Sequence, residues 1–521
     1  MTRPRRWCSG VVGLLALLWI TPQSAAGTGA DIARDVLGGQ TAFSSNRAGP
    51  VSTEPWWRSF NDAALDSLIA RALRDSPDVA AQVAVAEQAR MNGSAALSGL
   101  MPQVSFDASV SGSPTDALGF QFGGFGGSGS VDVLVGMDTL QDVDGDGVPD
   151  VALNPLYQTI EIERGDADLS DVTWNGAARL NAAWNLDIFG NQVQSWQASR
   201  HAAKASLGDR DAMALTVATT VSGAWYDLVL AQARLDVVRQ QLEANTQLME
   251  VVQLRYEAGS ASGLEVLQQR QQLATTQALL PAAEHGIRRT TYRLAVLLGT
   301  RPAELADRLT APDRLPTVPP PPSIGSPADL VRNRPDVLAA VARVDSAVAN
   351  RKGMWRDALP TLGVSANAGW QYFSQGEWDS TDIWGVGANA SVPLFNGGRV
   401  YSQGKAAAAG ERAAVESARR VVLVAVQEVE DALLFEDQSE AELEANRVRR
   451  EAAQLAHEDA RERYINGLTD LTTVLTTQSA WQSAELSLLN AERTRIAARI
   501  VLHDALGGPW TQTLAATGEV Q

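Results

Sequence analysis

Four stretches of the chain alternate apolar and polar residues with a period of two, over residues 104–111, 174–186, 362–372 and 384–392. This period predicts β-strands that each have one apolar face and one polar face. Five large aromatic residues lie towards the ends of these strands: Trp174, Trp184, Trp370, Tyr372 and Trp384. Such strands are typical of a transmembrane barrel whose aromatic side chains lie near the membrane boundaries. Half-buried strands of a soluble sandwich are the alternative interpretation.

Long stretches with a helical pattern separate the strands. Between Gly190 and Tyr256 there is no proline. Apolar residues recur there every seven positions, at Val221, Leu228, Leu235, Leu242, Met249 and Tyr256. The pattern predicts one helix about 100 Å long with a coiled-coil seam. A matching stretch over residues 398–464 repeats the spacing through Leu434, Ala441, Val448 and Leu455.

A helical stretch runs back after each of these two segments, so each forms one arm of a helical hairpin. Carboxylates and arginines are mixed along the helices, which predicts solvated charged faces. A soluble coiled-coil rod is the alternative interpretation, but a rod has no use for amphipathic strands.

The order of the motifs indicates two copies of one unit. Ser76-Pro77-Asp78-Val79 returns 258 residues later as Arg334-Pro335-Asp336-Val337, and Tyr256-x-x-Gly259 returns 208 residues later as Tyr464-x-x-Gly467. Each copy reads as helix, strand, loop, strand and long helical hairpin, and the prolines at 319–322 predict a stiff extended linker between the copies. The predicted divisions are a signal peptide (1–26), an extended N-terminal segment (27–61), repeat one (62–314), a proline-rich linker (315–325), repeat two (326–508) and a C-terminal tail (509–521).

The N-terminus has the pattern of a secretory signal. Arg3, Arg5 and Arg6 precede an apolar run over residues 11–20, and small residues follow up to Ala26. The run is far shorter than the roughly 20 residues of a membrane-spanning helix, so we predict cleavage after Ala26 and export from the cytoplasm.

Four strands are too few to close a membrane barrel, which needs roughly eight or more. Open strand edges are not tolerated in lipid. The sequence therefore predicts an α+β membrane protein that assembles as a homotrimer, with a twelve-stranded barrel continued by a helical barrel. The polar strand faces would line a water-filled duct.

Composition excludes several classes of protein. The chain has 60 acidic and 43 basic residues, a net charge of −17, so we expect no nucleic-acid partner. Its single cysteine and four scattered histidines argue against a Cys-based zinc site and a His-rich metal site. No nucleophile elbow, phosphate-binding loop or zinc-protease motif occurs, so we expect no enzymatic activity. A surface adhesin or receptor is a second candidate.

The loop over residues 113–173 contains 52 extra residues relative to repeat two, and it holds ten aspartates and two glutamates against one arginine. We place it on the extracellular side, because the helices occupy the other. Part of it matches the start of a calcium loop, with a glycine at position six but no acid at position twelve. The candidate ligands of a weak calcium site are Asp142, Asp144, Asp146 and Asp150. A solvated loop that binds no ion is the alternative; no other cofactor is expected.

Several longer motifs occur in a fixed order: Pro-Trp-Trp-Arg-Ser-Phe at 55–60, Trp-Asn-Leu-Asp-Ile-Phe-Gly at 184–190, Tyr-Glu-Ala-Gly-Ser-Ala-Ser-Gly-Leu-Glu-Val-Leu at 256–267, Leu-Ala-Val-Leu-Leu-Gly at 294–299 and Asn-Arg-Pro-Asp-Val at 333–337. Together they resemble the TolC-like outer-membrane efflux proteins, and most of all the NodT-type branch that serves resistance-nodulation-division (RND) pumps. The resemblance covers roughly residues 54–510.

The resemblance implies a trimeric exit duct in the outer membrane of a Gram-negative cell, with its helices in the periplasm. It also implies a periplasmic adaptor and an inner-membrane RND pump as partners; type I protein secretion is the alternative route. The two turns would form the periplasmic tips where the adaptor docks, through Tyr256, Gly259, Ser262, Leu264, Leu267, Tyr464, Gly467 and Leu475. Two features depart from the family: there is no lipid-acceptor cysteine, and Thr473-Val474-Leu475-Thr476 replaces the Asp-Val-Leu-Asp of gated relatives.

Overall fold

The computed structural model describes residues 29–38, 42–44, 49, 52, 54–114, 131–137, 155–160, 172–306, 309–374, 378–508 and 510–511. These residues belong to two compact units. The helical unit is drawn from Met1–Ser98, Phe189–Leu359 and Pro393–Gln521, and the strand unit from Gly99–Ile188 and Pro360–Val392.

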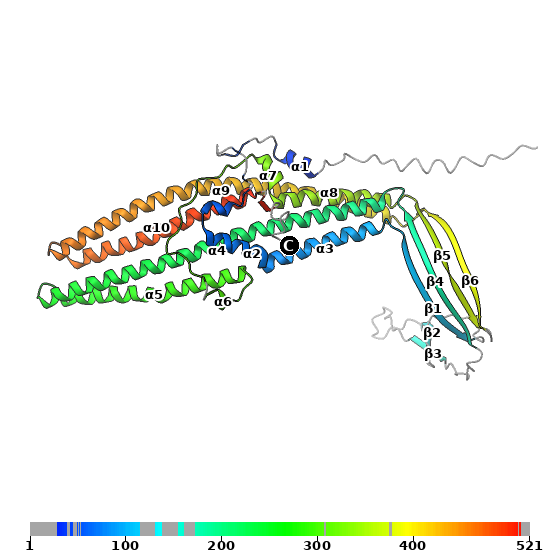
Figure 1. Ribbon diagram of the computed structural model, residues 1–521, viewed down its shortest axis with the longest axis horizontal. Helices are drawn as coiled ribbons and strands as arrows, with labels where there is room; N and C mark the ends of the chain where they lie inside the picture. Colours follow the sequence, from blue (N-terminus) through cyan, green and yellow to red (C-terminus); the bar gives the residue numbers. More distant parts are fainter. Residues whose placement is uncertain are drawn as a thin grey trace, which may run out of the picture. The chain divides into compact units, whose positions relative to one another are not determined.

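The helical unit contains two long hairpins. Helix α4 (Asn191–Glu257) lies beside α5 (Gly263–Leu297), and α9 (Arg399–Ile465) lies beside α10 (Leu471–Leu506), as Figure 1 shows. Helices α4 and α9 have 67 residues each, which corresponds to about 100 Å, as the sequence predicts. The other helices are α1 (Gly29–Val36), η2 (Trp56–Phe60), α2 (Ala63–Asp75), α3 (Pro77–Ser98), α6 (Pro302–Ala306), α7 (Pro327–Asn333) and α8 (Pro335–Arg356). Part of α4 is long and apolar enough to cross a membrane, but 67% of that stretch is buried within the fold.

Equal helix lengths recur along the chain. Helices α3 and α8 have 22 residues each and begin at Pro77 and Pro335, at the first offset found in the sequence. Helices α4 and α9 each follow a glycine with a positive φ, Gly190 and Gly398. The same local signals therefore start the same elements in both halves.

The predicted seam of α4 is buried over its first part, at Val221, Leu228 and Leu235. Further along, Asn245 and Val252, which continue the predicted seam three residues after Leu242 and Met249, are buried together with Gln241 and Leu248.

The predicted seam of α9 is not buried within the single chain. Leu434, Val448 and Leu455 are exposed by 65%, 60% and 59% of their surface. Helix α9 instead buries Val429, Leu433 and other residues on a different face. An apolar stripe in the sequence does not say which neighbour it will face.

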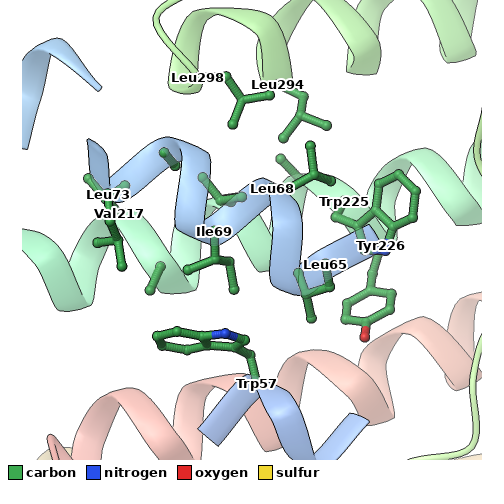
Figure 2. Close-up of a cluster of buried hydrophobic side chains, with 14 of the residues drawn as sticks. Trp57, Leu65, Leu68, Ile69, Leu73, Val217, Trp225, Tyr226, Leu294 and Leu298 are labelled. Atoms are coloured by element: carbon green, nitrogen blue, oxygen red, sulfur yellow. The ribbon is translucent and has the colours of Figure 1, made fainter. Parts of the chain in front are cut away.

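The main core lies where α2 packs against both α4 and α5 (Figure 2). Asp62 starts α2 by accepting hydrogen bonds from the backbone N–H groups of Ala64 and Leu65, at 3.0 and 3.1 Å. Apolar residues at helical spacing then fill the core against neighbouring elements. Those labelled in Figure 2 are Trp57, Leu65, Leu68, Ile69, Leu73, Val217, Trp225, Tyr226, Leu294 and Leu298.

The segment predicted to be extended, residues 27–61, contains the helices α1 and η2. An eight-residue helix is marginal on its own, so tertiary contacts must hold α1 in place. The Gly29 N–H donates to Asp345 Oδ1 at 3.0 Å, and Leu37 and Phe43 are buried near the start of repeat two. These contacts join residues distant in sequence, which local patterns cannot reveal.

The strand unit is a four-stranded antiparallel sheet in the order β1-β4-β5-β6, with β1 and β6 at its edges. Its strands are β1 (Gln103–Pro114), β4 (Val172–Leu186), β5 (Thr361–Ser374) and β6 (Trp378–Ser391). A second pair, β2 (Val131–Met137) and β3 (Pro155–Ile160), lies within the segment predicted to be a loop. The first strand of this pair reads Val-Asp-Val-Leu-Val, a short valine-rich run with strand propensity that the acidic composition of the loop obscures.

The strand register confirms the predicted two faces. Phe106, Leu180, Ala368 and Trp384 lie in one row across the four strands, on the apolar face. The next rows carry polar residues and glycines, for example Ser105, Asn181, Asn367 and Gly385.

Trp384 does not lie near a strand end. It pairs with Ala368 midway along β6, because β6 begins at Trp378. Residues Asp379 to Asp382 are all polar, so the first half of this strand lacks the period of two by which the sequence predicts strands.

Candidate functional site: the tips of the two helical hairpins

Both hairpins reverse direction through the same turn. Gly259 and Gly467 each have φ of 73°, a left-handed conformation that glycine adopts without strain. The turns are closed by matching backbone hydrogen bonds of 2.8 Å, from Ser260 N–H to Arg255 O and from Leu468 N–H to Arg463 O. A Cβ atom at either glycine would meet nothing within 4 Å, so both turns face open space.

The returning helices begin with side-chain caps. At α5, Ser262 and Glu265 cap each other, with the Ser262 N–H donating to Glu265 Oε1 at 3.0 Å. At α10, Asp470 accepts from the Thr473 N–H at 2.8 Å. The two turns are thus closed by different residues that play the same part.

Three side chains connect the two hairpins at their tips, and we call Arg255, Glu265 and Tyr464 the tip latch. The Tyr464 hydroxyl donates to Glu265 Oε2 at 2.9 Å. The Arg255 guanidinium lies 4.5 Å from the centre of the Tyr464 ring and donates to the backbone carbonyl of Tyr464. One hairpin therefore contributes a cation and a carboxylate, and the other the aromatic ring between them.

The charge states of the latch suit these bonds. The pKa of Glu265 lies below its ordinary value because its carboxylate accepts a hydrogen bond from the Ser262 backbone N–H, and also from the hydroxyls of Tyr464 and Ser262. Burial, together with the bond to Glu265, raises the pKa of Tyr464 to about 12. At neutral pH the carboxylate is charged and the phenol keeps its proton.

A buried amide layer connects the hairpins further from the tips. The Asn245 side chain of α4 donates to Thr276 Oγ1 of α5 at 2.8 Å and accepts from Gln478 Nε2 of α10 at 3.0 Å. Gln269 Nε2 donates to the Asn245 carbonyl at 2.9 Å. Polar groups buried in this way fix the register of packed helices.

A protein-family model for outer membrane efflux proteins matches residues 149–300 and 327–508. The matched regions include both hairpins and their tips. The chain belongs to this family. It is an outer-membrane efflux protein of the kind found in Gram-negative bacteria.

Curated relatives span most of the chain. It is 26% identical over 470 residues to the pyoverdine export outer membrane protein OpmQ of Pseudomonas aeruginosa, an alignment that covers 90% of each protein. It is also 26% identical over 349 residues to nodulation protein T of Rhizobium leguminosarum bv. viciae, covering 67% of this chain and 72% of that one.

Solved structures share the fold. The outer-membrane channel OprN superimposes with a TM-score of 0.73 at 23% identity, over 91% of this chain and 98% of that one. The outer membrane protein VceC of Vibrio cholerae superimposes with a TM-score of 0.70 at 21% identity, over 88% and 100%.

The predicted docking residues differ in how far they are exposed. Tyr256, Leu264 and Leu267 are exposed by 48%, 65% and 61% of their surface. Tyr464 is 1% exposed, so it serves the latch and offers no docking surface, and Leu475 is partly buried beside it. Ser262 caps α5.

The predicted list of docking residues leaves out Arg255, Glu265 and the exposed Leu468, although the last two lie within the predicted turns, 256–267 and 464–475. Glu265 lies three positions after Ser262, which is the spacing of a capping box and so a signal for a helix start. Leu468, directly after the second turn, is 76% exposed, and the first turn has no apolar side chain at the equivalent position, which is Ser260.

Of the two other groups of predicted sites, the structure describes the membrane-boundary aromatics but not the calcium ligands. The boundary aromatics are exposed by 41% (Trp174), 42% (Trp184), 54% (Trp370), 41% (Tyr372) and 80% (Trp384). The calcium ligands Asp142, Asp144, Asp146 and Asp150 lie outside the described residues, and this site stays a prediction. Among the residues that the structure does describe, no cluster of His, Cys, Asp or Glu could hold a metal ion.

Replacing Tyr464 with phenylalanine is expected to loosen the tips. The change removes the bond to Glu265 but keeps the ring that packs under Arg255. Loss of one such hydrogen bond, about 1 kcal/mol, corresponds to about fivefold faster amide exchange in the turns. Hydrogen exchange followed by mass spectrometry over 255–270 and 463–475 measures this effect.

The matched control is Tyr256→Phe, which makes the same change at the equivalent, exposed tyrosine of the first turn. We expect no change in exchange there. Equal exchange in the two variants would show that the hydroxyl of Tyr464 does not restrain the tips.

Proposed function

We propose that three copies of this chain form the outer-membrane channel of a tripartite efflux system. The observation that carries the proposal is a sheet with an exposed apolar face and two free edges, β1 and β6. Lipid does not tolerate unpaired strand edges, so β6 of one copy pairs with β1 of the next. Three sheets close a twelve-stranded barrel with its polar faces towards an aqueous duct.

The exposed stripe of α9 supports the same assembly. Leu434, Val448 and Leu455 lie at seven-residue spacing and are more than half exposed in the single chain. A regular apolar stripe on a helix is the pattern that packs against another helix. In the trimer it packs against a helix of the neighbouring copy, which makes a continuous helical wall.

The tips form the periplasmic entrance, where an adaptor protein docks and an inner-membrane RND pump delivers small solutes. Tyr256, Leu264, Leu267 and Leu468 offer an apolar rim for the adaptor. The tip latch holds the two hairpins of each chain together until docking competes with it. The duct itself supplies no energy and is a passive exit.

The proposal is tested in a strain that lacks the gene. Intracellular accumulation of the pump's substrates is expected to rise and to return to normal when the gene is restored. Native mass spectrometry of the detergent-purified protein is expected to give a trimer. A monomer, or unchanged accumulation in the deletion strain, would contradict the proposal.

Two neighbouring residues of β6 distinguish the faces of the sheet. Ala388 pairs with Val364 on the apolar face, and Asn389 pairs with Gly363 on the polar face. Ala388→Arg places a charge in lipid and is expected to impair insertion, at about 2–4 kcal/mol if it lies near the midplane. Asn389→Arg, which points into the duct, is expected to insert normally.

The amount of folded trimer in outer-membrane fractions, seen as heat-modifiable bands on gels, measures both variants. Equal assembly of the two would mean that the lipid and duct faces are wrongly assigned.

A further inference from the structure

The polar face of the described strands carries one positive charge, Arg179, among carboxylates that include its neighbour Asp107 and Asp379. Arg179 on β4 is the only lysine or arginine among the described residues of the strand unit. It lies in register with Asp107 on β1 and with Gly369 on β5. A cation on the wall of a duct acts on every charged solute that passes it, because the low-dielectric walls of a narrow water-filled space focus its electric field.

Asp107 does not neutralise Arg179, although the two residues are direct neighbours across the strands. The Asp107 carboxylate accepts from Asn181 Nδ2 and, at 3.2 Å, from Ser105 Oγ. Arg179 Nη2 instead donates to Gln371 Oε1 at 3.2 Å. Among the described residues of the sheet, the two side chains bond to other partners and not to each other. Each charge is held by neutral groups.

The surroundings of Arg179 leave most of its donors unused. A Cβ atom at Gly369 would lie 2.1 Å from the Ala178 carbonyl oxygen, so this position, which is in register with Arg179, admits no side chain. The buried Nε atom of Arg179 has no hydrogen-bond partner among the described residues. A guanidinium has five N–H donors arranged to bind carboxylate or phosphate oxygens, and here one protein acceptor is engaged.

We propose that Arg179 contacts anions in transit and sets the charge preference of the strand section. In the closed barrel, three copies of Arg179, each beside an Asp107, form a ring of guanidinium groups with unused donors that favours solutes with carboxylate or phosphate groups. The inference rests on the proposed function, in which the polar faces line the duct.

Ion selectivity of the purified trimer in planar lipid bilayers tests the proposal. The reversal potential under a KCl gradient gives the ratio of chloride to potassium permeability. Arg179→Gln is expected to lower the ratio by about twofold or more, because it removes the charge and keeps a polar side chain of similar shape.

Two further variants separate charge from structure. Arg179→Lys keeps the charge and is expected to keep the wild-type ratio. Asp107→Asn is expected to raise the ratio, and it tests the same wall if Arg179→Gln does not assemble.

An unchanged ratio in conducting Arg179→Gln and Asp107→Asn channels would overturn the proposal. Absence of any conductance, in the unaltered trimer as well, would instead contradict the proposed duct and this inference with it.

Discussion

Replacing Glu436 with glutamine is expected to lower the free energy of unfolding of the helical unit by about 3–5 kcal/mol. Glu436 and Arg499 are both 0% exposed, and Arg495 is 8% exposed. The Glu436 carboxylate forms an ion pair with Arg495 Nη1 at 2.7 Å and accepts a hydrogen bond from Arg499 Nε at 3.1 Å. Glutamine keeps the volume but leaves two buried guanidinium groups without their shared negative charge.

This cluster also holds the linker between the two halves. Arg499 Nη1 donates to the carbonyls of Pro319 and, at 2.7 Å, Pro320. The prolines have no N–H to donate, so their carbonyls are the only backbone groups that can be anchored. Loss of Glu436 is therefore expected to release the linker as well as to destabilise α9 and α10.

The control for Glu436→Gln is Glu440→Gln, one helical turn further along α9. Glu440 also pairs with Arg495, at 3.3 Å, but its side chain is 67% exposed. An exposed pair contributes roughly 0–1 kcal/mol, so we expect little change. Urea titrations of the purified protein, followed by tryptophan fluorescence, compare the two variants. Similar losses in both would show that burial of the charge cluster is not the source of its effect.

The effect of Glu436→Gln depends on pH. Burial alone would raise the pKa of Glu436, but the hydrogen bonds and charges of Arg499 and Arg495 hold it below the ordinary value of 4.5. Because the pKa is lower in the folded protein, this stabilisation is complete at neutral pH and is lost as the pH falls through the lowered value. The difference between wild type and variant is therefore expected to shrink in acid.

The sequence predicts elements better than it predicts partners. A period of two predicted the strands, and long proline-free stretches with an apolar repeat predicted the hairpins. Both patterns depend on which side of each element is apolar. The charged cluster around Glu436 was missed, because a carboxylate among arginines in a helix usually marks a solvated face. Only the tertiary packing of α9 against α10 and the linker buries it.

The two tyrosines of the turns show the same limit. Tyr256 and Tyr464 occupy equivalent positions in the same motif, yet one is exposed and the other buried. Their difference depends on Arg255 and Glu265, both contributed by the first hairpin. A repeated motif predicts a repeated turn, but it cannot predict which copy makes the contact between hairpins. The tip glycines are the part of the site that the sequence defined well.

The double variant Gly259→Asp/Gly467→Asp is expected to abolish efflux while the trimer still assembles. Aspartate tolerates a left-handed φ better than most residues, and a Cβ at either position meets nothing within 4 Å. The turns should therefore persist. Each chain would place two carboxylates on the rim beside the exposed side chains of Leu264 and Leu468. An adaptor that covers this rim must bury them without a partner, at a cost that prevents docking.

The control adds the same two charges to the hairpins away from the tips. Gly286 in α5 and Gly410 in α9 lie inside helices, and a Cβ at either also meets nothing within 4 Å. Gly286→Asp/Gly410→Asp is expected to retain efflux. Substrate accumulation in a deletion strain that carries each variant, with trimer amounts measured in the same membranes, compares them. Normal efflux from the tip variant would show that the rim is not the docking surface, whereas equal loss in both variants would attribute the effect to added charge alone.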